Sequence, residues 1–244
     1  MSSGYTLSHT QPGKGDAYDR DYQTSIFLTY LWEKERKLLV DLICRERLRH
    51  GADEPFGYLD FACGTARVLS ALEGYASRAV GLDVSSEMLH AAQHKVSSAE
   101  LVLGDFVEDP DIVRGKFHFV TAFRFFPNAD PGLREKAAAY LSERTARGGL
   151  LVVNNHQNST SLLCVLGRLV GKRWPWTPMR TRHLIDLLTG VGFELVGRRS
   201  YGVLPGTARR PYLPTWIHAL VDEACNNLGL RNFGQDVILW FRRR

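Results

Sequence analysis

The sequence lacks a long apolar run and has only four cysteines among its 244 residues. Its longest apolar runs, LLVV and SLLCVL, are far shorter than the ~20 residues of a membrane-spanning helix, and the first 16 residues contain no apolar signal region. The cysteines are widely scattered and form no C-x-x-C pair, so neither a zinc site nor a disulfide framework is indicated. We therefore expect a cytoplasmic protein with reduced thiols.

Phosphate-binding and metal-binding sequences are also missing. A dinucleotide-binding loop needs three glycines in the pattern G-x-G-x-x-G, but here only Gly64 is present and Ala62 takes the first position. The stretch GRLVGKR lacks both the spacing of a phosphate-binding P-loop and the Ser or Thr after its lysine. No group of Asp, Asn and His residues has the spacing typical of a divalent metal site, so we expect no metal.

Charge is divided unequally between the two halves of the chain. Residues 1–113 contain 11 Lys and Arg against 18 Asp and Glu, whereas residues 114–244 contain 20 against 8. The halves thus carry formal charges of −7 and +12, which sum to the net +5 of the chain. The second half could attract an anionic partner, or its charge could serve only solubility, with the basic tail FRRR included.

Short apolar segments of strand character alternate with helical patterns along most of the chain. The expected strands are residues 56–62, 78–84, 99–106, 116–123, 148–155, 194–204 and 236–241. Such alternation is typical of an α/β protein with a parallel sheet and crossover helices, and the two closely spaced last strands suggest one antiparallel strand near the C-terminus. We expect a single domain with an N-terminal arm and helices (1–50), a core (51–155) and a C-terminal part (156–244).

The residues that follow the first three strands share the features of a nucleoside pocket. Small Ala62, Gly64 and Ala66 after the first strand let a ligand approach the backbone. Asp83, at the end of the second strand, can accept hydrogen bonds from two ribose hydroxyls. The third strand is followed by GDF, where the carboxylate can bind an exocyclic amino group and the ring can stack on a purine.

Four stretches in this order, LDFACGTAR, GLDVSSEML, LVLGDF and FHFVTAFRFFPNA, resemble the successive motifs of the class I S-adenosylmethionine-dependent methyltransferases. The resemblance covers about residues 18–155 and implies a Rossmann-like seven-stranded, mostly parallel sheet with helices on both faces. It also implies S-adenosylmethionine as the cofactor. The first motif of the family is usually closer to LDLGCGTGR, so Ala62 and Ala66 depart from it.

The resemblance assigns roles to individual residues. The loop from Ala62 to Ala66 would lie under the methionine part of the cofactor, Asp83 would bind the ribose, and Asp105 would hold the adenine amino group. The stretch YDRDY resembles the tyrosine lid of many members, so Tyr18 and Tyr22 would close over the cofactor. The candidate cofactor-binding residues are Tyr18, Tyr22, Asp60, Ala62, Gly64, Asp83, Val84, Met88, Asp105, Phe106 and Phe123.

His156 is the candidate catalytic base. It follows the fifth strand in VVNNHQN, and methyl transfer to a hydroxyl needs a group that takes the proton as the oxygen attacks. The alternative is a histidine that hydrogen-bonds its own turn. On the acceptor side the candidates are Arg124 and, in the insertion after the fifth strand, Arg173, Trp174, Trp176, Arg180 and Arg182, since arginines bind anions and tryptophan stacks on flat rings. The residues of the insertion alternatively belong to a solvated basic loop with a tryptophan anchored in the core.

These observations predict an enzyme that methylates an oxygen of a small-molecule or glycan acceptor, which would be anionic. One alternative is RNA methylation, which the basic half favours but which the absence of an RNA-binding module or aromatic-basic strand motif makes unlikely. Another is a module of the same fold that binds a cofactor or partner without catalysis, as the two alanines suggest. The short apolar segment SLLCVLGRLVGK could also rest on a membrane surface.

Overall fold

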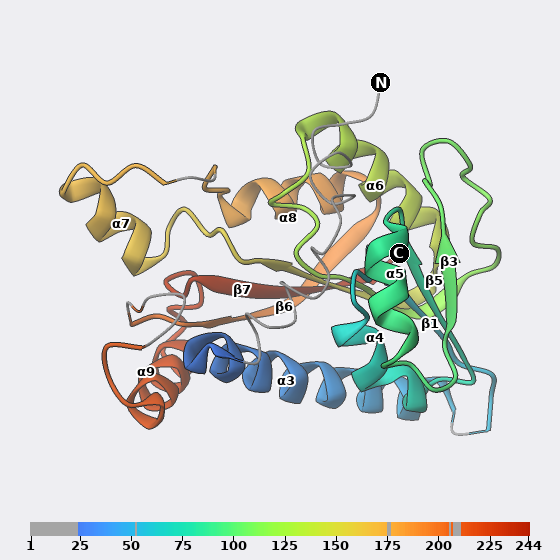
Figure 1. Cartoon of the computed structure of the whole chain (residues 1–244), viewed down its shortest axis with the longest axis horizontal. Helices are drawn as coiled ribbons and strands as arrows, with labels where there is room; N and C mark the ends of the chain where they lie inside the picture. Colours follow the sequence, from blue (N-terminus) through green and yellow to red (C-terminus); the bar gives the residue numbers. More distant parts are fainter. Residues whose placement is uncertain (1–23, 52, 175–176, 205, 207–210) are drawn as a thin grey trace.

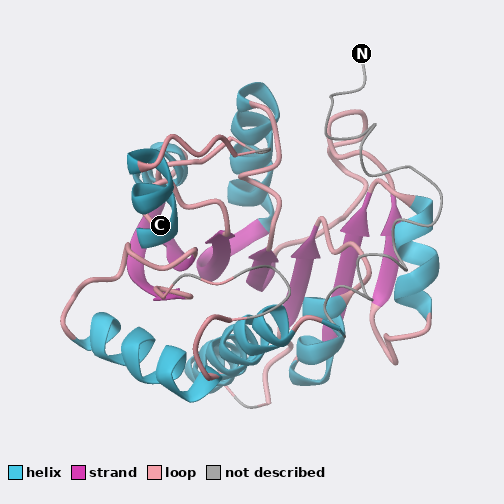
Figure 2. Ribbon diagram, turned by 60° about the vertical axis from the view of Figure 1, so that its left-hand side comes forward, coloured by secondary structure: helices cyan, strands magenta, loops and turns pink. Residues whose placement is uncertain are grey.

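A single seven-stranded sheet forms the centre of the computed structural model, which describes residues 24–51, 53–174, 177–204, 206 and 211–244. Its strand order is β3-β2-β1-β4-β5-β7-β6. β7 runs antiparallel to β5 and β6, and the other neighbouring strands pair in parallel, which confirms the predicted sheet (Figure 2). The strands are β1 (Gly57–Phe61), β2 (Arg78–Asp83), β3 (Glu100–Leu103), β4 (Phe117–Ala122), β5 (Thr145–Asn155), β6 (Phe193–Tyr201) and β7 (Asp236–Arg243).

Helices cover both faces of the sheet, as predicted (Figure 1). One apolar cluster joins the sheet to α3, α4 and α5, and a second joins its other face to α6 and α8. None of the described helices is both long and apolar enough to cross a bilayer. The helices are α3 (Ile26–His50), α4 (Arg67–Leu72), α5 (Ser86–Gln93), α6 (Pro131–Arg144), α7 (Leu162–Leu169), α8 (Thr181–Gly190) and α9 (Thr215–Asn227).

The helical pattern near the N-terminus forms one long helix, α3. It begins after Ser25, whose hydroxyl accepts a hydrogen bond from the backbone N–H of Leu28 at 3.1 Å and so caps the helix. Its apolar side chains pack on the same face of the sheet as α4, and Glu35 is buried among them. A charged residue in the EKERK run is thus part of the interior, which its sequence surroundings did not indicate.

The helix after β1 ends in a 3₁₀ turn: α4 ends at Leu72 and continues as the turn Glu73–Tyr75. The Glu73 carboxylate in this turn accepts hydrogen bonds from the backbone N–H groups of Ser97, Ser98 and Ala99 at 2.7 to 2.9 Å. This contact ties the turn to the loop before β3 and fixes the position of the edge strand.

Candidate functional site

The candidate site lies at the carboxyl edge of the sheet, where the strand order reverses between β1 and β4. In an open parallel sheet the loops on the two sides of such a point separate and leave a crevice for a ligand. Three cavities follow one another here and share lining residues. Cavity A shares Ala62 and Asp83 with cavity B, and it shares Arg124 and His156 with cavity C.

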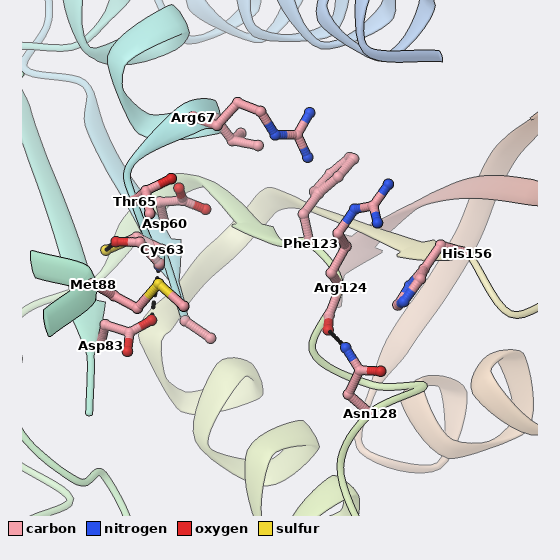
Figure 3. A pocket seen from close by; sticks show the side chains of 13 residues that line it. Asp60, Cys63, Thr65, Arg67, Asp83, Met88, Phe123, Arg124, Asn128 and His156 are labelled. Atoms are coloured by element: carbon pink, nitrogen blue, oxygen red, sulfur yellow. Dashed lines mark hydrogen bonds between the residues drawn. The ribbon is translucent and has the colours of Figure 1, made fainter. Parts of the chain in front are cut away.

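Cavity A, of about 140 Å³, lies between the loops after β1, β2, β4 and β5. In Figure 3, Asp60, Cys63, Asp83 and Met88 line one side, while Arg124, Asn128 and His156 face them from the other. The full lining also includes Ala62, Gly64, Thr65, Arg67, Val68 and Phe123.

Cavities B and C extend this space in two directions. Cavity B is a narrow apolar cleft of about 40 Å³ whose walls include Val84, Asp105 and Phe106. Cavity C is the largest of the three at about 390 Å³ and lies between α3 and the segment around α7. It contains Phe27, Leu28 and Leu31 from α3 together with Leu163, Lys172, Trp174, Gly206, Tyr212, Gln235 and Asp236.

The loop after β1 has a left-handed backbone at three positions. The φ angles are 54° at Ala62, 54° at Gly64 and 60° at Ala66. A glycine adopts this conformation freely, whereas an alanine in it costs roughly 1 kcal/mol. The loop therefore keeps a glycine-type path with two strained alanines, and such strain at a ligand site is typical of functional loops.

Asp83 joins two of the loops around cavity A. Its Oδ2 accepts a hydrogen bond from the backbone N–H of Gly64 at 2.8 Å, and its Oδ1 accepts one from the N–H of Ser85 at 2.9 Å. The carboxylate thus holds the loop after β1 against the turn after β2.

Asp60 is a buried carboxyl on the wall of cavity A. Its Oδ1 accepts a hydrogen bond from the Thr121 hydroxyl at 2.6 Å, but no hydrogen bond reaches its buried Oδ2 within the described part of the chain. Burial raises the pKa of Asp60 to about 7, although the Thr121 bond and the charge of Arg67 oppose this shift. An unpaired buried carboxyl of this kind favours a cationic ligand group.

His156 lies where cavities A and C meet. Burial lowers the pKa of its imidazole well below the ordinary value, and the charges of Arg124 and Arg67 act in the same direction. Its Nδ1 is buried and has no hydrogen-bond partner among the described residues. The ring is therefore neutral, and no described residue uses its Nδ1 to hold the turn.

Arg124 is held at the same junction by its backbone. Its φ of 59° is left-handed, and its N–H donates to Asn154 Oδ1 at 2.6 Å while its carbonyl accepts from Asn128 Nδ2 at 2.6 Å. The Asn154 amide also donates to both oxygens of the Asp236 carboxyl at 3.1 Å. The junction residue is thus positioned by contacts to β5 and β7.

A buried pair of carboxyls, Glu35 and Asp236, lies behind the junction and was not predicted from the sequence. Burial alone would raise the pKa of Glu35, but Arg67, at 3.0 Å, and Arg124 outweigh it and lower the pKa. Burial and the facing Glu35 raise the pKa of Asp236 well above its ordinary value. The two pKa shifts have opposite directions, so the pair favours a single negative charge, on Glu35, the carboxylate beside Arg67.

The remaining predicted residues divide into three groups. Met88 and Phe123 line cavity A, and Val84, Asp105 and Phe106 line cavity B. Arg173 and Arg180 are exposed and line none of the three cavities. Tyr18, Tyr22 and Trp176 lie outside the described residues.

Lys172 and Trp174 are the basic and aromatic residues that the basic loop contributes to cavity C. The Lys172 Nζ lies 4.3 Å from the centre of the Trp174 ring, a cation–π distance. Trp174 was among the candidates from the sequence, whereas Lys172 was missed, because an irregular loop has no periodicity that shows which side chains face inward.

Comparisons with known proteins relate the middle of the chain to a known domain family and the whole chain to a known fold. Residues 59–149 match the methyltransferase domain family. No curated protein sequence matches the chain.

Three solved structures illustrate the shared fold. The magnesium protoporphyrin IX methyltransferase of Synechocystis PCC 6803, crystallised with bound SAH, has a TM-score of 0.64 at 15% identity and covers 98% of this chain and 99% of its own. The N-methyltransferase NodS of Bradyrhizobium japonicum WM9 has a TM-score of 0.59 at 15% identity and covers 91% of this chain and 90% of its own. The [4+2]-cyclase SpnF has a TM-score of 0.54 at 18% identity and covers 85% of this chain and 81% of its own. These likenesses establish the fold.

Proposed function

We propose that this chain, which carries a methyltransferase domain on the class I S-adenosylmethionine-dependent methyltransferase fold, transfers a methyl group to an oxygen of a small-molecule or glycan acceptor. The observation that carries the proposal is the meeting of cavities A and C at His156 and Arg124. A donor in cavity A and an acceptor in cavity C would come together at a neutral imidazole.

The residues of cavities A and B fit S-adenosylmethionine. The unpaired Oδ2 of Asp60 suits the positively charged end of this molecule, and the left-handed loop from Ala62 to Ala66 leaves its backbone open to a close ligand. Asp83 would accept hydrogen bonds from the ribose hydroxyls. Cavity B, with Asp105 and Phe106, suits a flat adenine ring.

Bound S-adenosylmethionine supplies an electrophilic methyl group on a cationic sulfur. The chain itself aligns the acceptor oxygen with that methyl group and excludes water, and these are the main requirements of such a transfer. His156 accepts the hydroxyl proton as the oxygen attacks, because its imidazole is neutral and lies where cavities A and C meet.

The walls of cavity C suit an acceptor with an apolar or ring-shaped body and a negative charge. Leu28, Leu31 and Trp174 provide apolar surface, and Lys172 provides a cation at the same cavity. A negative acceptor would also offset the charge of Arg124, which disfavours protonation of His156. A volume of about 390 Å³ accommodates a small molecule or one to two sugar rings.

The first test is calorimetric titration with S-adenosylmethionine and S-adenosylhomocysteine, with NAD as the control, followed by transfer assays on phenolic and glycan hydroxyls. His156→Gln should reduce kcat by roughly 100-fold or more while the cofactor Kd stays unchanged, since only the proton acceptor is removed. His183→Gln, on an exposed histidine at the start of α8, is the matched control and should change neither value. Equal activity of both variants would contradict the role of His156.

A second reading, in which this fold carries out no methyl transfer, is favoured by the strained alanines at positions 62 and 66. SpnF, which shares the fold, is a [4+2]-cyclase, so the fold alone does not require methyl transfer. Cofactor binding without turnover on any hydroxyl, carboxylate, amine or RNA acceptor would favour this second reading. Transfer to RNA with steep salt dependence would instead favour an RNA substrate.

A further inference from the structure

Helix α7 presents an apolar surface to solvent. Leu169 is 78% exposed and Val170 is 81% exposed, and Val165 and Leu166 are also exposed. We call these four residues the α7 ridge. None of them belongs to either apolar cluster of the fold, so the core does not need their apolar character. Contiguous exposed apolar side chains of this kind are typical of interaction surfaces.

The opposite side of α7 is fixed to the rest of the molecule. Cys164 and Gly167 are buried, and Gly167 is so close to the Trp174 ring that an added Cβ would lie 2.8 Å from it. The Ser161 hydroxyl caps the helix, and the backbone N–H of Leu162 donates to the carbonyl of Phe233 at 3.0 Å. The ridge is therefore held outward by the fold, at the end of the molecule where α7 projects (Figure 1).

The charge around the ridge has one sign. Residues 144–185 contain seven Lys and Arg and no Asp or Glu. Arg168, Lys172 and Arg173 lie within or directly after the ridge, and none of the three forms an ion pair with a described residue. A surface that combines exposed aliphatic side chains with unneutralised cations matches a bilayer of anionic lipids, where the aliphatic groups enter the interface and the cations face the headgroups.

We propose that the α7 ridge docks on an anionic membrane surface. An anionic bilayer fits this surface better than a protein interface does, because its headgroups would neutralise all three cations beside the apolar centre. Leu163, Lys172 and Trp174, from the same segment, line cavity C, so docking would bring that cavity close to the lipid. This inference does not depend on the proposed methyl transfer.

The test is co-sedimentation of the full chain with vesicles, in the absence of any methyl donor. Vesicles of phosphatidylcholine with about 30% phosphatidylglycerol should bind the protein, and vesicles of phosphatidylcholine alone should bind it at least several-fold more weakly. The double variant Leu169→Glu, Val170→Glu should weaken binding to the anionic vesicles by roughly tenfold or more. Both side chains are exposed, so this variant should keep the thermal melting temperature of the wild type.

Leu48→Glu is the matched control. Leu48 is 75% exposed near the end of α3, which lies at the opposite end of the molecule from α7 (Figure 1), so this variant adds charge at an equally exposed apolar residue. It should bind the anionic vesicles within about twofold of the wild type. Lys172→Ala with Arg173→Ala should weaken binding and reduce its dependence on salt.

Three results would overturn the inference. The wild type could fail to bind either kind of vesicle, or Leu48→Glu could lose as much binding as the ridge variant. In the third result, the wild type would not bind vesicles but would form a dimer in solution, and the ridge variant would abolish that dimer. The ridge would then be a contact between two copies of the chain. Because no cofactor is present, failure here leaves the methyltransferase proposal unaffected.

Discussion

Replacement of Asp60 by asparagine should remove a pH dependence from the binding of S-adenosylmethionine. In the ligand-free protein, burial raises the pKa of this carboxyl to about 7. A cationic ligand beside the unpaired Oδ2 favours the ionised carboxylate, so binding at lower pH must first remove the proton. The affinity of the wild type should therefore rise as the pH rises through about 7.

The size of the effect follows from the pKa. If only the ionised carboxylate binds tightly, the apparent Kd is larger by a factor of one plus ten to the power of pKa minus pH. With a pKa of about 7, that factor is close to 1 at pH 8 and close to 11 at pH 6, so binding should weaken roughly tenfold between them.

The same shift affects stability in the opposite direction. Because the folded pKa of about 7 lies above the ordinary value of 3.8, the ligand-free folded protein holds the Asp60 proton over that window. This group therefore makes the free energy of unfolding fall as the pH rises from about 4 to about 7. Bound S-adenosylmethionine should reduce that slope, which thermal melts with and without the ligand would detect.

The assay is calorimetric titration at pH 6, 7 and 8 with the wild type, Asp60→Asn and Asp105→Asn. Asp60→Asn should bind weakly and equally at all three pH values. Asp105→Asn is the control, because this carboxylate lines cavity B and accepts a hydrogen bond from the Val107 N–H at 2.9 Å; it should keep the slope of the wild type. A wild-type affinity that is flat from pH 6 to 8, or a slope that persists in Asp60→Asn, would refute the reasoning.

Two further predictions concern stability. Ala62→Gly and Ala66→Gly relieve left-handed strain but increase the freedom of the unfolded chain. In denaturant titrations, each variant should therefore keep a free energy of unfolding within about 1 kcal/mol of the wild type. A clearly larger loss of stability would show that the loop is not strained. Arg67→Met leaves the buried Glu35 carboxylate without its partner and should destabilise the fold by about 3 kcal/mol at pH 8. Adding Glu35→Gln should recover part of that loss, and no recovery would contradict the ion-pair assignment.

The sheet could be predicted because its signals are local. Each strand is a short apolar segment between a turn and a helix, and the crossover rule then fixes the parallel pairing. The role of Glu73 could not be predicted, since its carboxylate accepts hydrogen bonds from backbone N–H groups 24 to 26 residues away. Contacts of that length leave no mark in a window of neighbouring residues.

The walls of cavities A and B could also be predicted in part, because Asp60, Asp83 and Asp105 lie at or just after the ends of successive strands. Glu35 was not visible. It lies in a run of charged residues that resembles a solvated helix face, and only the fold brings it within 3.0 Å of Arg67, 32 residues later. The strained backbone at Ala62 was hidden for another reason, since alanine does not itself indicate a left-handed conformation and only the family motif has glycine there.

The difference between donor and acceptor sides has a structural cause. Cavities A and B are built from turns that directly follow strands, so the sheet itself determines where their residues lie. Most of the wall of cavity C comes from outside the strands: Phe27, Leu28 and Leu31 of α3, Leu163, Lys172 and Trp174 around α7, and Gly206 and Tyr212. These segments can change in sequence without moving Asp60 or Asp83. If cavity C holds the acceptor, as proposed, substitution of Lys172 and Trp174 should change acceptor preference without changing cofactor affinity.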